Sequence, residues 1–159
     1  ELFENLDKIT DGKEGEETYY QQKSRMIKNM KKVILLSVHS ALETFGKRLV
    51  REQEVMNNIA DMISELYIAE SLALRVEKIE PMKGAEAGVY KDMLDVFMYD
   101  TVSKVRKWAH DAVYSSLEGT DTEKLITGIN TLTNLPGVNV KEARRRIAAK
   151  LIEDNTYKF

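Results

Sequence analysis

Apolar side chains recur every three or four residues along most of this chain, the spacing of one face of an α-helix. Two prolines and eight glycines are the main breaks in 159 residues, so long helices are expected. One row follows Thr18 and comprises Ile27, Met30, Ile34, Val38, Leu42, Phe45 and Leu49. A second, within residues 51–79, comprises Met56, Ile59, Ile63, Leu66, Ala69, Ala73 and Val76. A third, within residues 86–117, comprises Tyr90, Met93, Phe97, Thr101, Val105, Trp108, Ala112 and Val113. These rows predict an all-α protein.

Turn-forming residues mark where the helices end. A break near Gly46 or Arg51 is open on the sequence alone, and Pro81 with Gly84 is expected to interrupt the pattern before the third helix. Gly119 suits the end of that helix.

Two shorter helices follow. Thr120-Asp-Thr-Glu123 predicts a capping box, in which the Thr120 hydroxyl accepts from the Glu123 amide and the Glu123 carboxylate reaches back. Leu135-Pro136-Gly137 ends that helix, and Asn139 caps the last one. In the last helix Ala143, Ile147 and Leu151 are expected to face inward, and Arg144, Arg145 and Arg146 largely outward. We predict an antiparallel helical bundle of the four-helix up-and-down type, whose last two helices together complete the fourth side.

The domain division is simple. Residues 1–17 are rich in charge and include Gly12 and Gly15, which predicts a linker or lead-in, and residues 18–159 form one helical domain. The chain begins with Glu1 rather than methionine, so we expect a processed product or a piece of a longer polypeptide.

Composition excludes several functions. The chain has no cysteine, which rules out disulfides, thiol catalysis and thiolate metal sites. A net charge of −2 gives no general reason to bind nucleic acid. The longest apolar run, Val33 to Leu36, is far too short to span a bilayer, and no signal peptide is visible.

Isolated candidates for chemistry favour structural interpretations. A di-iron bundle needs Glu-x-x-His pairs, but Leu36 precedes His39 and Lys107 precedes His110 at that spacing. Asp61 and Glu65 share a helix face and are interpreted as a rim that pairs with neighbouring cations, rather than as an acid–base pair. We therefore predict no catalytic, cofactor-binding or metal-binding residue in this chain.

A basic cluster lies near the start of the first helix and comprises Lys23, Arg25, Lys28, Lys31 and Lys32. A basic amphipathic helix can lie on an anionic membrane surface, but the apolar face of this helix must also fill the core. A solvated helix face is the favoured interpretation. Tyr19 and Tyr20 flank the cluster without any recognised nucleic-acid motif.

One segment carries a more specific pattern: Gln53, six residues, then Ala60-Asp61-Met62, on a helix that continues to Val76. It resembles a helix of the C-terminal domain of acyl-CoA dehydrogenases, and most of all the extra C-terminal helical domain of the very-long-chain type and its bacterial relatives. Lys31-Lys32, and the ending with Pro136, Asn139, the arginines and Tyr157-Lys-Phe159, are also similar to that domain. The resemblance covers residues 26–159.

Glu118-Gly119-Thr120 spells the triplet in which many of these enzymes place the glutamate that removes the substrate's α-proton. The family reaches that triplet through a glycine-rich turn and an Arg-Asp segment, whereas here Ala112 to Leu117 runs directly into Glu118. A glutamate at a helix junction has a sufficient structural reason, so a catalytic role is not predicted.

The resemblance implies an accessory domain of a long-chain acyl-CoA dehydrogenase of fatty acid β-oxidation. The parent would hold FAD, pass electrons to an electron-transfer flavoprotein and act in the cytoplasm, with membrane association possible through the parent. The domain itself would hold no cofactor and would pack against the upstream catalytic domains and the dimer mate. The alternatives are a free-standing interaction or membrane-surface module, and, ranked last, an independent enzyme.

Overall fold

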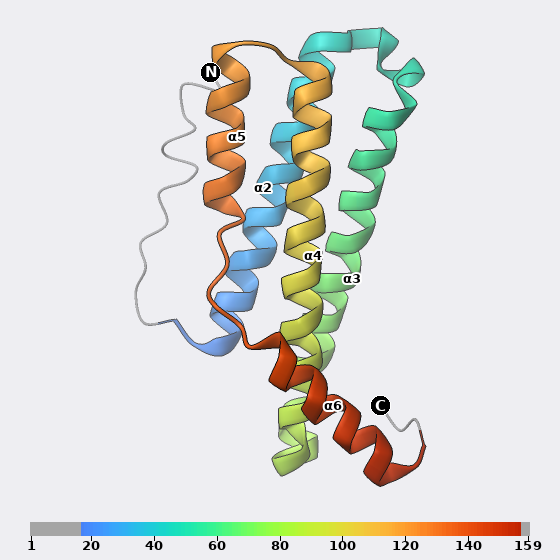
Figure 1. The fold of residues 1–159 in the computed structure, drawn as a ribbon, viewed down its shortest axis with the longest axis vertical. Helices are drawn as coiled ribbons and strands as arrows, with labels where there is room; N and C mark the ends of the chain where they lie inside the picture. Colours follow the sequence, from blue (N-terminus) through green and yellow to red (C-terminus); the bar gives the residue numbers. More distant parts are fainter. Residues whose placement is uncertain (1–16, 157–159) are drawn as a thin grey trace.

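The computed structural model describes residues 17–156, and every regular element in that range is helical (Figure 1). The elements are α2 (Tyr19–Phe45), η2 (Gly46–Arg51), α3 (Gln53–Lys83), η3 (Gly84–Glu86), α4 (Ala87–Ser116), α5 (Thr120–Leu132) and α6 (Val140–Asp154). The all-α prediction is therefore confirmed over the described residues. The expected lead-in lies outside them except for Glu17.

The ends of the long helices follow from local chemistry. Thr18 caps α2 by accepting a hydrogen bond from the Gln21 amide, while the Gln21 side chain accepts one from the Thr18 amide. The helix ends at Gly46 and α3 ends at Gly84, both at positive φ, a conformation that strains residues with a side chain. The chain reverses at η2, so that α3 runs back alongside α2 (Figure 1).

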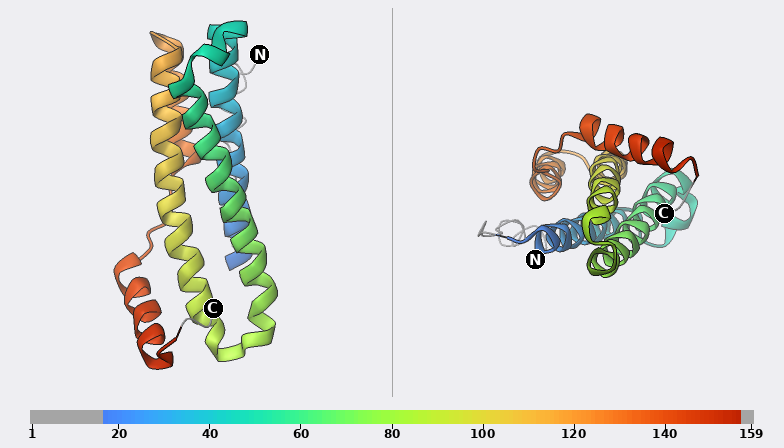
Figure 2. Two further views of the ribbon diagram at one scale, coloured as in Figure 1. Left: turned by 90° about the vertical axis from the view of Figure 1, so that its right-hand side faces the viewer. Right: turned by 90° about the horizontal axis from the view of Figure 1, so that it is seen from below.

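α4 lies at the centre of the arrangement and packs against α2, α3, α5 and α6 (Figure 2). α5 lies against both α2 and α4, and its end is fixed by Arg106. The Arg106 guanidinium donates to the Thr133 hydroxyl at 2.8 Å and to the Thr133 carbonyl. α6 does not lie beside α5 but crosses the outer surface of α4. The expectation that the last two helices together complete the fourth side of the bundle is therefore wrong. Of these two helices, only α5 packs against both α2 and α4, and α6 covers another part of α4.

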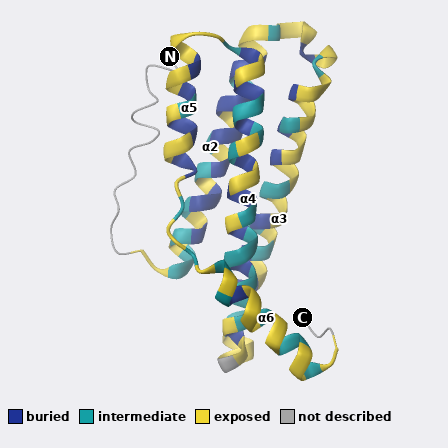
Figure 3. Ribbon diagram, viewed as in Figure 1, coloured by how far each residue is buried: buried dark blue, intermediate teal, exposed yellow. Residues whose placement is uncertain are grey.

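The core runs lengthwise between these helices, where the buried residues line the inward faces (Figure 3). Its largest fully buried side chains come from α2, α3, α4 and α5 and include Met30, Met62, Leu94, Met98, Leu125 and Ile129. By contrast, Ala143 is the only buried residue of α6. Burial of apolar side chains therefore contributes little to holding α6 against the bundle.

Four members of the predicted apolar rows are not in the core, one of them the half-buried Met93. Leu42, Met56 and Ile63 are all exposed, and Val55 and Met62 fill the core positions on α3 instead. For Met56 and Ile63 the error has a physical cause: α3 carries two apolar rows, and periodicity alone does not tell which of them the bundle buries.

Two helix boundaries also differ from the sequence prediction. Pro81 does not interrupt α3, because the Gly84 amide still donates to the Glu80 carbonyl and the helix ends only there. Thr120 is the first residue of α5 rather than its cap, Gly119 holds the cap position, and no side-chain hydrogen bond closes that end. The Asn139 cap is confirmed, since its side chain accepts from the Glu142 amide at 3.2 Å. The break between the first two long helices is the 3₁₀-helix η2.

Over residues 17–156, no helix combines the length and the apolarity that a bilayer crossing requires.

We expect Leu94→Ala to lower the free energy of unfolding by about 2–5 kcal/mol, because it leaves a cavity in a fully buried site. Leu35→Ala, at an exposed position of α2, is the matched control and should change it by less than about 0.5 kcal/mol. Urea denaturation followed by circular dichroism measures both. Equal losses for the two variants would contradict this description of the core.

Candidate functional site

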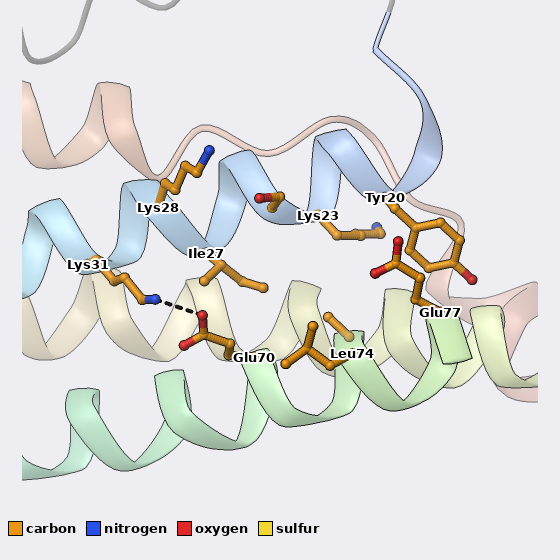
Figure 4. A pocket seen from close by; sticks show the side chains of 10 residues that line it. Tyr20, Lys23, Ile27, Lys28, Lys31, Glu70, Leu74 and Glu77 are labelled. Carbon is orange, nitrogen blue, oxygen red and sulfur yellow. Dashed lines mark hydrogen bonds and ion pairs between the residues drawn. The ribbon is translucent and has the colours of Figure 1, made fainter. Parts of the chain in front are cut away.

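A groove of about 170 Å³ lies between α2 and α3 and contains part of the basic cluster (Figure 4). We call it the α2–α3 groove; it is lined by Tyr20, Lys23, Ser24, Ile27, Lys28, Lys31, Glu70, Ala73, Leu74 and Glu77. Lys31 reaches across it to the Glu70 carboxylate at 2.7 Å, whereas Lys28 points away from Glu70. The groove thus has mixed charge and an apolar floor.

The basic cluster is not a continuous cationic surface. Besides the Lys31–Glu70 pair, Arg25 pairs with Glu17 at 2.8 Å, and Lys23 is buried and pairs with Asp95 of α4 at 2.5 Å. Lys23, Arg25 and Lys31 thus each have a carboxylate partner. The interpretation as a solvated face is wrong for Lys23, because its side chain enters the space between α2 and α4.

The Lys23–Asp95 pair belongs to a larger polar network at the start of α2. The Tyr19 hydroxyl donates to an Asp95 carboxylate oxygen at 2.9 Å and to the Lys91 carbonyl at 3.2 Å. Burial, reinforced by the charge of Asp95, raises the pKa of Tyr19 well above its usual range. Lys23 and Lys91 also lie over the Tyr19 ring, 4.9 and 5.1 Å from its centroid. The network joins α2 to α4 and keeps Tyr19 a neutral donor.

Lys91 continues the network to α3 by pairing with Glu80. The hydrogen bond from Lys91 lowers the pKa of the Glu80 carboxyl. The start of α2, the end of α3 and the start of α4 are therefore tied together by charge as well as by the core.

A second groove, of about 330 Å³, lies where α2 and α4 meet the segment before α6. Its lining includes Lys23, Arg146, Asp92 and Asp95. Both cations are already matched: Lys23 by Asp95, and Arg146 by Asp92, with two hydrogen bonds of 2.7 and 2.6 Å. The hydrogen bond that Arg146 donates to Asp92 raises the pKa of Arg146 above its usual value. Such a neutralised groove has no free charge to hold a phosphate.

The arginines of α6 mainly fasten that helix. Besides the Arg146–Asp92 pair, Arg144 binds both oxygens of Asp100 at 3.2 and 3.1 Å, and Arg145 pairs with Glu142 of its own helix. All three remain exposed, as predicted. The sequence does not reveal that Asp92 and Asp100 of α4 bind these arginines, or that Asp95 binds Lys23. Each of these acids lies more than forty residues from the cation it contacts.

The triplet Glu118-Gly119-Thr120 lies at the junction of α4 and α5, and all three residues are exposed. Glu118 lines neither of the two grooves. The structure brings it together with none of the other candidate residues described above.

The remaining candidates are dispersed. His110 bonds to the Asn130 side chain at 3.0 Å, and His39 lies on α2. Glu65 accepts from the Thr101 hydroxyl at 2.9 Å and from Lys104 at 2.6 Å, which is the predicted pairing of a helix rim with a neighbour, while Asp61 is exposed. Over residues 17–156, no group of three or more histidines and carboxylates is arranged to hold a metal.

Comparisons with known proteins agree on one relationship. The sequence model described as "Acyl-CoA dehydrogenase, C-terminal domain" matches residues 29–131. A probable acyl-CoA dehydrogenase of Bacillus subtilis (strain 168) is 29% identical over 138 residues, which are 86% of this chain and 23% of that protein. The crystal structure of acyl-CoA dehydrogenase complexed with FAD from Bacillus anthracis superposes with a TM-score of 0.88 at 28% identity, over 99% of this chain and 27% of that one. This chain therefore spans about a quarter of the length of the relatives it matches.

We expect Lys23→Met to destabilise the fold by about 3 kcal/mol, because it leaves the partly buried Asp95 carboxylate without its cation. Lys31→Met is the matched control: it removes an exposed pair and should cost less than about 1 kcal/mol. Chemical denaturation of both variants makes the comparison. A Lys23→Met variant as stable as Lys31→Met would show that the network is not needed for stability.

Proposed function

This chain belongs to the family of acyl-CoA dehydrogenase C-terminal domains, and from that membership we propose that it is the accessory helical domain of a longer, FAD-dependent acyl-CoA dehydrogenase. We assign the parent to the very-long-chain type and the helices α2 to α5 to the four-helix up-and-down arrangement. The match over residues 29–131 carries the proposal, and the superposition over nearly the whole chain supports it.

In this proposal the parent oxidises a long-chain acyl-CoA to the trans-2-enoyl thioester in the cytoplasm and passes electrons to an electron-transfer flavoprotein. The domain spans residues 18–159, with residues 1–17 as its lead-in. It is not catalytic by itself, and it stabilises the catalytic dimer by burying apolar surface against it.

The flavin is assigned to the remainder of the polypeptide because the two grooves of this domain do not suit it. A dinucleotide needs donors for its two phosphates, and three of the four cations that line the grooves, Lys23, Lys31 and Arg146, already bind carboxylates. Neither groove is lined by a glycine-rich turn of the kind that cradles phosphate.

The pairing of the basic cluster also weighs against the membrane-surface alternative. A polybasic surface attracts anionic lipid through several unpaired cations, each contributing about 1 kcal/mol. With Lys23 buried and Lys31 bound to Glu70, this surface offers few of them.

We expect that deleting residues 18–159 from the native polypeptide leaves bound flavin in place but weakens assembly, since only the apolar contacts of the domain are lost. Sedimentation velocity should show dissociation of the dimer, and the melting temperature should fall. Flavin absorbance of the purified protein is the control for an intact catalytic part. A truncated protein with unchanged oligomeric state and melting temperature would contradict the proposed role.

For Glu118→Gln in the native polypeptide, we expect the turnover rate with acyl-CoA to stay within about two-fold, because this exposed side chain lies outside both grooves. Loss of a catalytic base would instead cost about 10²- to 10⁴-fold. Glu43→Gln, at an exposed position of α2, is the matched control. A loss of the larger size that is confined to Glu118→Gln would make this residue catalytic.

A further inference from the structure

Helix α3 carries two rows of side chains with the spacing that packs against another helix. The inner row is buried or half-buried in the bundle and comprises Val55, Ile59, Met62, Leu66, Ala69, Ala73 and Val76. The outer row alternates steps of three and four and comprises Gln53, Met56, Ala60, Ile63, Tyr67, Glu70 and Leu74. Alternating steps of three and four are typical of a seam between two helices. The bundle supplies a partner for the inner row.

The most exposed residues of the outer row are apolar, and α2 contributes two further exposed leucines. The exposed fractions are 66% for Leu35, 52% for Leu42, 41% for Met56, 51% for Ile63, 73% for Tyr67 and 62% for Leu74. Single exposed apolar residues are ordinary, but six large ones on two adjacent helices indicate an interaction surface.

The Lys31–Glu70 ion pair shows that the residues of α2 and α3 share one side of the molecule. Ser24, Lys31, Leu35 and Leu42 follow one another at steps of seven, four and seven, so they align along α2. Glu70 belongs to the outer row of α3, and Lys31 binds it at 2.7 Å (Figure 4). Because α3 runs back alongside α2, Leu35 and Leu42 lie beside the part of α3 that precedes Glu70. We name this surface the outer face; it comprises Leu35, Leu42, Met56, Ala60, Ile63, Tyr67 and Leu74.

We propose that the outer face is the docking site of a helical segment in the remaining part of the dehydrogenase polypeptide. The proposal rests on the proposed function, since it requires that a longer parent exists. It adds the surface through which the domain stabilises that parent. The spacing of the outer row commits the occupant to a helix with its own apolar row.

The size of the outer face favours a tethered occupant over a second copy. The row from Met56 to Leu74 covers 18 residues, or roughly 27 Å of helix, and the spacing of neighbouring helices is about 10 Å. Its area is thus on the order of 300 Å², well below the ~800 Å² per partner of a typical stable complex between separate proteins. A partner in the same polypeptide needs less area, because the tether holds it at a high effective concentration. The relatives offer such a partner, since the matched domain is only about a quarter of their length.

Charge disfavours the other occupants. The outer face includes no lysine or arginine of its own; of the two exposed lysines in the adjoining groove, Lys31 is bound to Glu70, which leaves Lys28 as a single cation beside Leu74. An anionic membrane or a nucleic acid requires unpaired cations around the apolar surface. An apolar protein helix does not.

Hydroxyl-radical footprinting of the native polypeptide and of this 159-residue chain tests the proposal, because radical attack reports the exposure of individual side chains. We expect Met56 and Tyr67 to react at least three-fold more slowly in the native polypeptide than in this chain. Met82 and Tyr114, which are 77% and 61% exposed and lie outside the outer face, are the matched controls and should react equally in both. Equal reactivity of Met56 and Tyr67 in the two proteins would overturn the proposal.

A charged substitution provides a second readout. Ile63→Asp in the native polypeptide should restore the reactivity of Met56 and Tyr67 to that seen in this chain, because a carboxylate cannot be buried in an apolar seam. Ile152→Asp, at a 79% exposed position of α6, should leave the protection unchanged. If both variants keep the protection, the docked helix does not lie on the outer face and the proposal fails.

These experiments distinguish an error in the proposed docking site from an error in the proposed function. A lowered melting temperature after deletion of the domain, with no protection of Met56 and Tyr67, overturns only the outer face. Protection of this chain by itself that rises with its concentration would make a second copy the occupant and overturn the proposal. So would protection that appears only with vesicles of anionic lipid. Without a dehydrogenase region in the native polypeptide, both proposals fail.

Discussion

The other helices of the described fold depend on their contact with α4. Small and β-branched residues on this helix, among them Val105, Ala109, Ala112 and Val113, are fully buried and let α2, α3 and α5 approach it closely. The acidic residues of α4 bind two of its neighbours: Asp95 binds Lys23 of α2, and Asp92 and Asp100 bind arginines of α6. One helix therefore supplies both the apolar centre and the charged attachments. α6 depends most on the charges, because it buries so little apolar surface.

Much of this fold could be predicted from the sequence, because helix periodicity and helix-ending glycines are local properties. The turn at Gly84 and the Asn139 cap lie where the sequence places them, whereas the sequence alone leaves the break near Gly46 open. The local predictions of a break at Pro81 and of a Thr120 cap are wrong, and the sequence does not predict most of the contacts with distant partners. The choice between Met56 and Met62 as a core residue follows from which face of α3 meets α2 and α4, and both residues fit a helical row. Likewise, the burial of Lys23 depends on Asp95, more than seventy residues away, which no local pattern reveals.

The candidate chemistry of the chain is reduced by the same contacts. Lys23 and Lys31 of the basic cluster pair with acids of α4 and α3, the histidines are dispersed, and Glu118 stands apart at an exposed junction. Among the described residues, the domain exposes large apolar side chains on α2 and α3, Leu35, Tyr67 and Leu74 among them. The Gln53-to-Met62 pattern divides in the same way: Met62 serves the core, while Gln53, Ala60 and Asp61 face outward on α3. Their exposure fits the proposal that a larger protein covers this side of the domain.

In the proposed function, this chain is one domain of a larger flavin-dependent acyl-CoA dehydrogenase. The most direct test is the intact mass and N-terminal sequence of the native polypeptide that contains residues 1–159. We expect a polypeptide several times longer, with a flavin-binding dehydrogenase region before Glu1. A native polypeptide that begins near Glu1 and carries no such region would contradict the claim and leave a free-standing helical module.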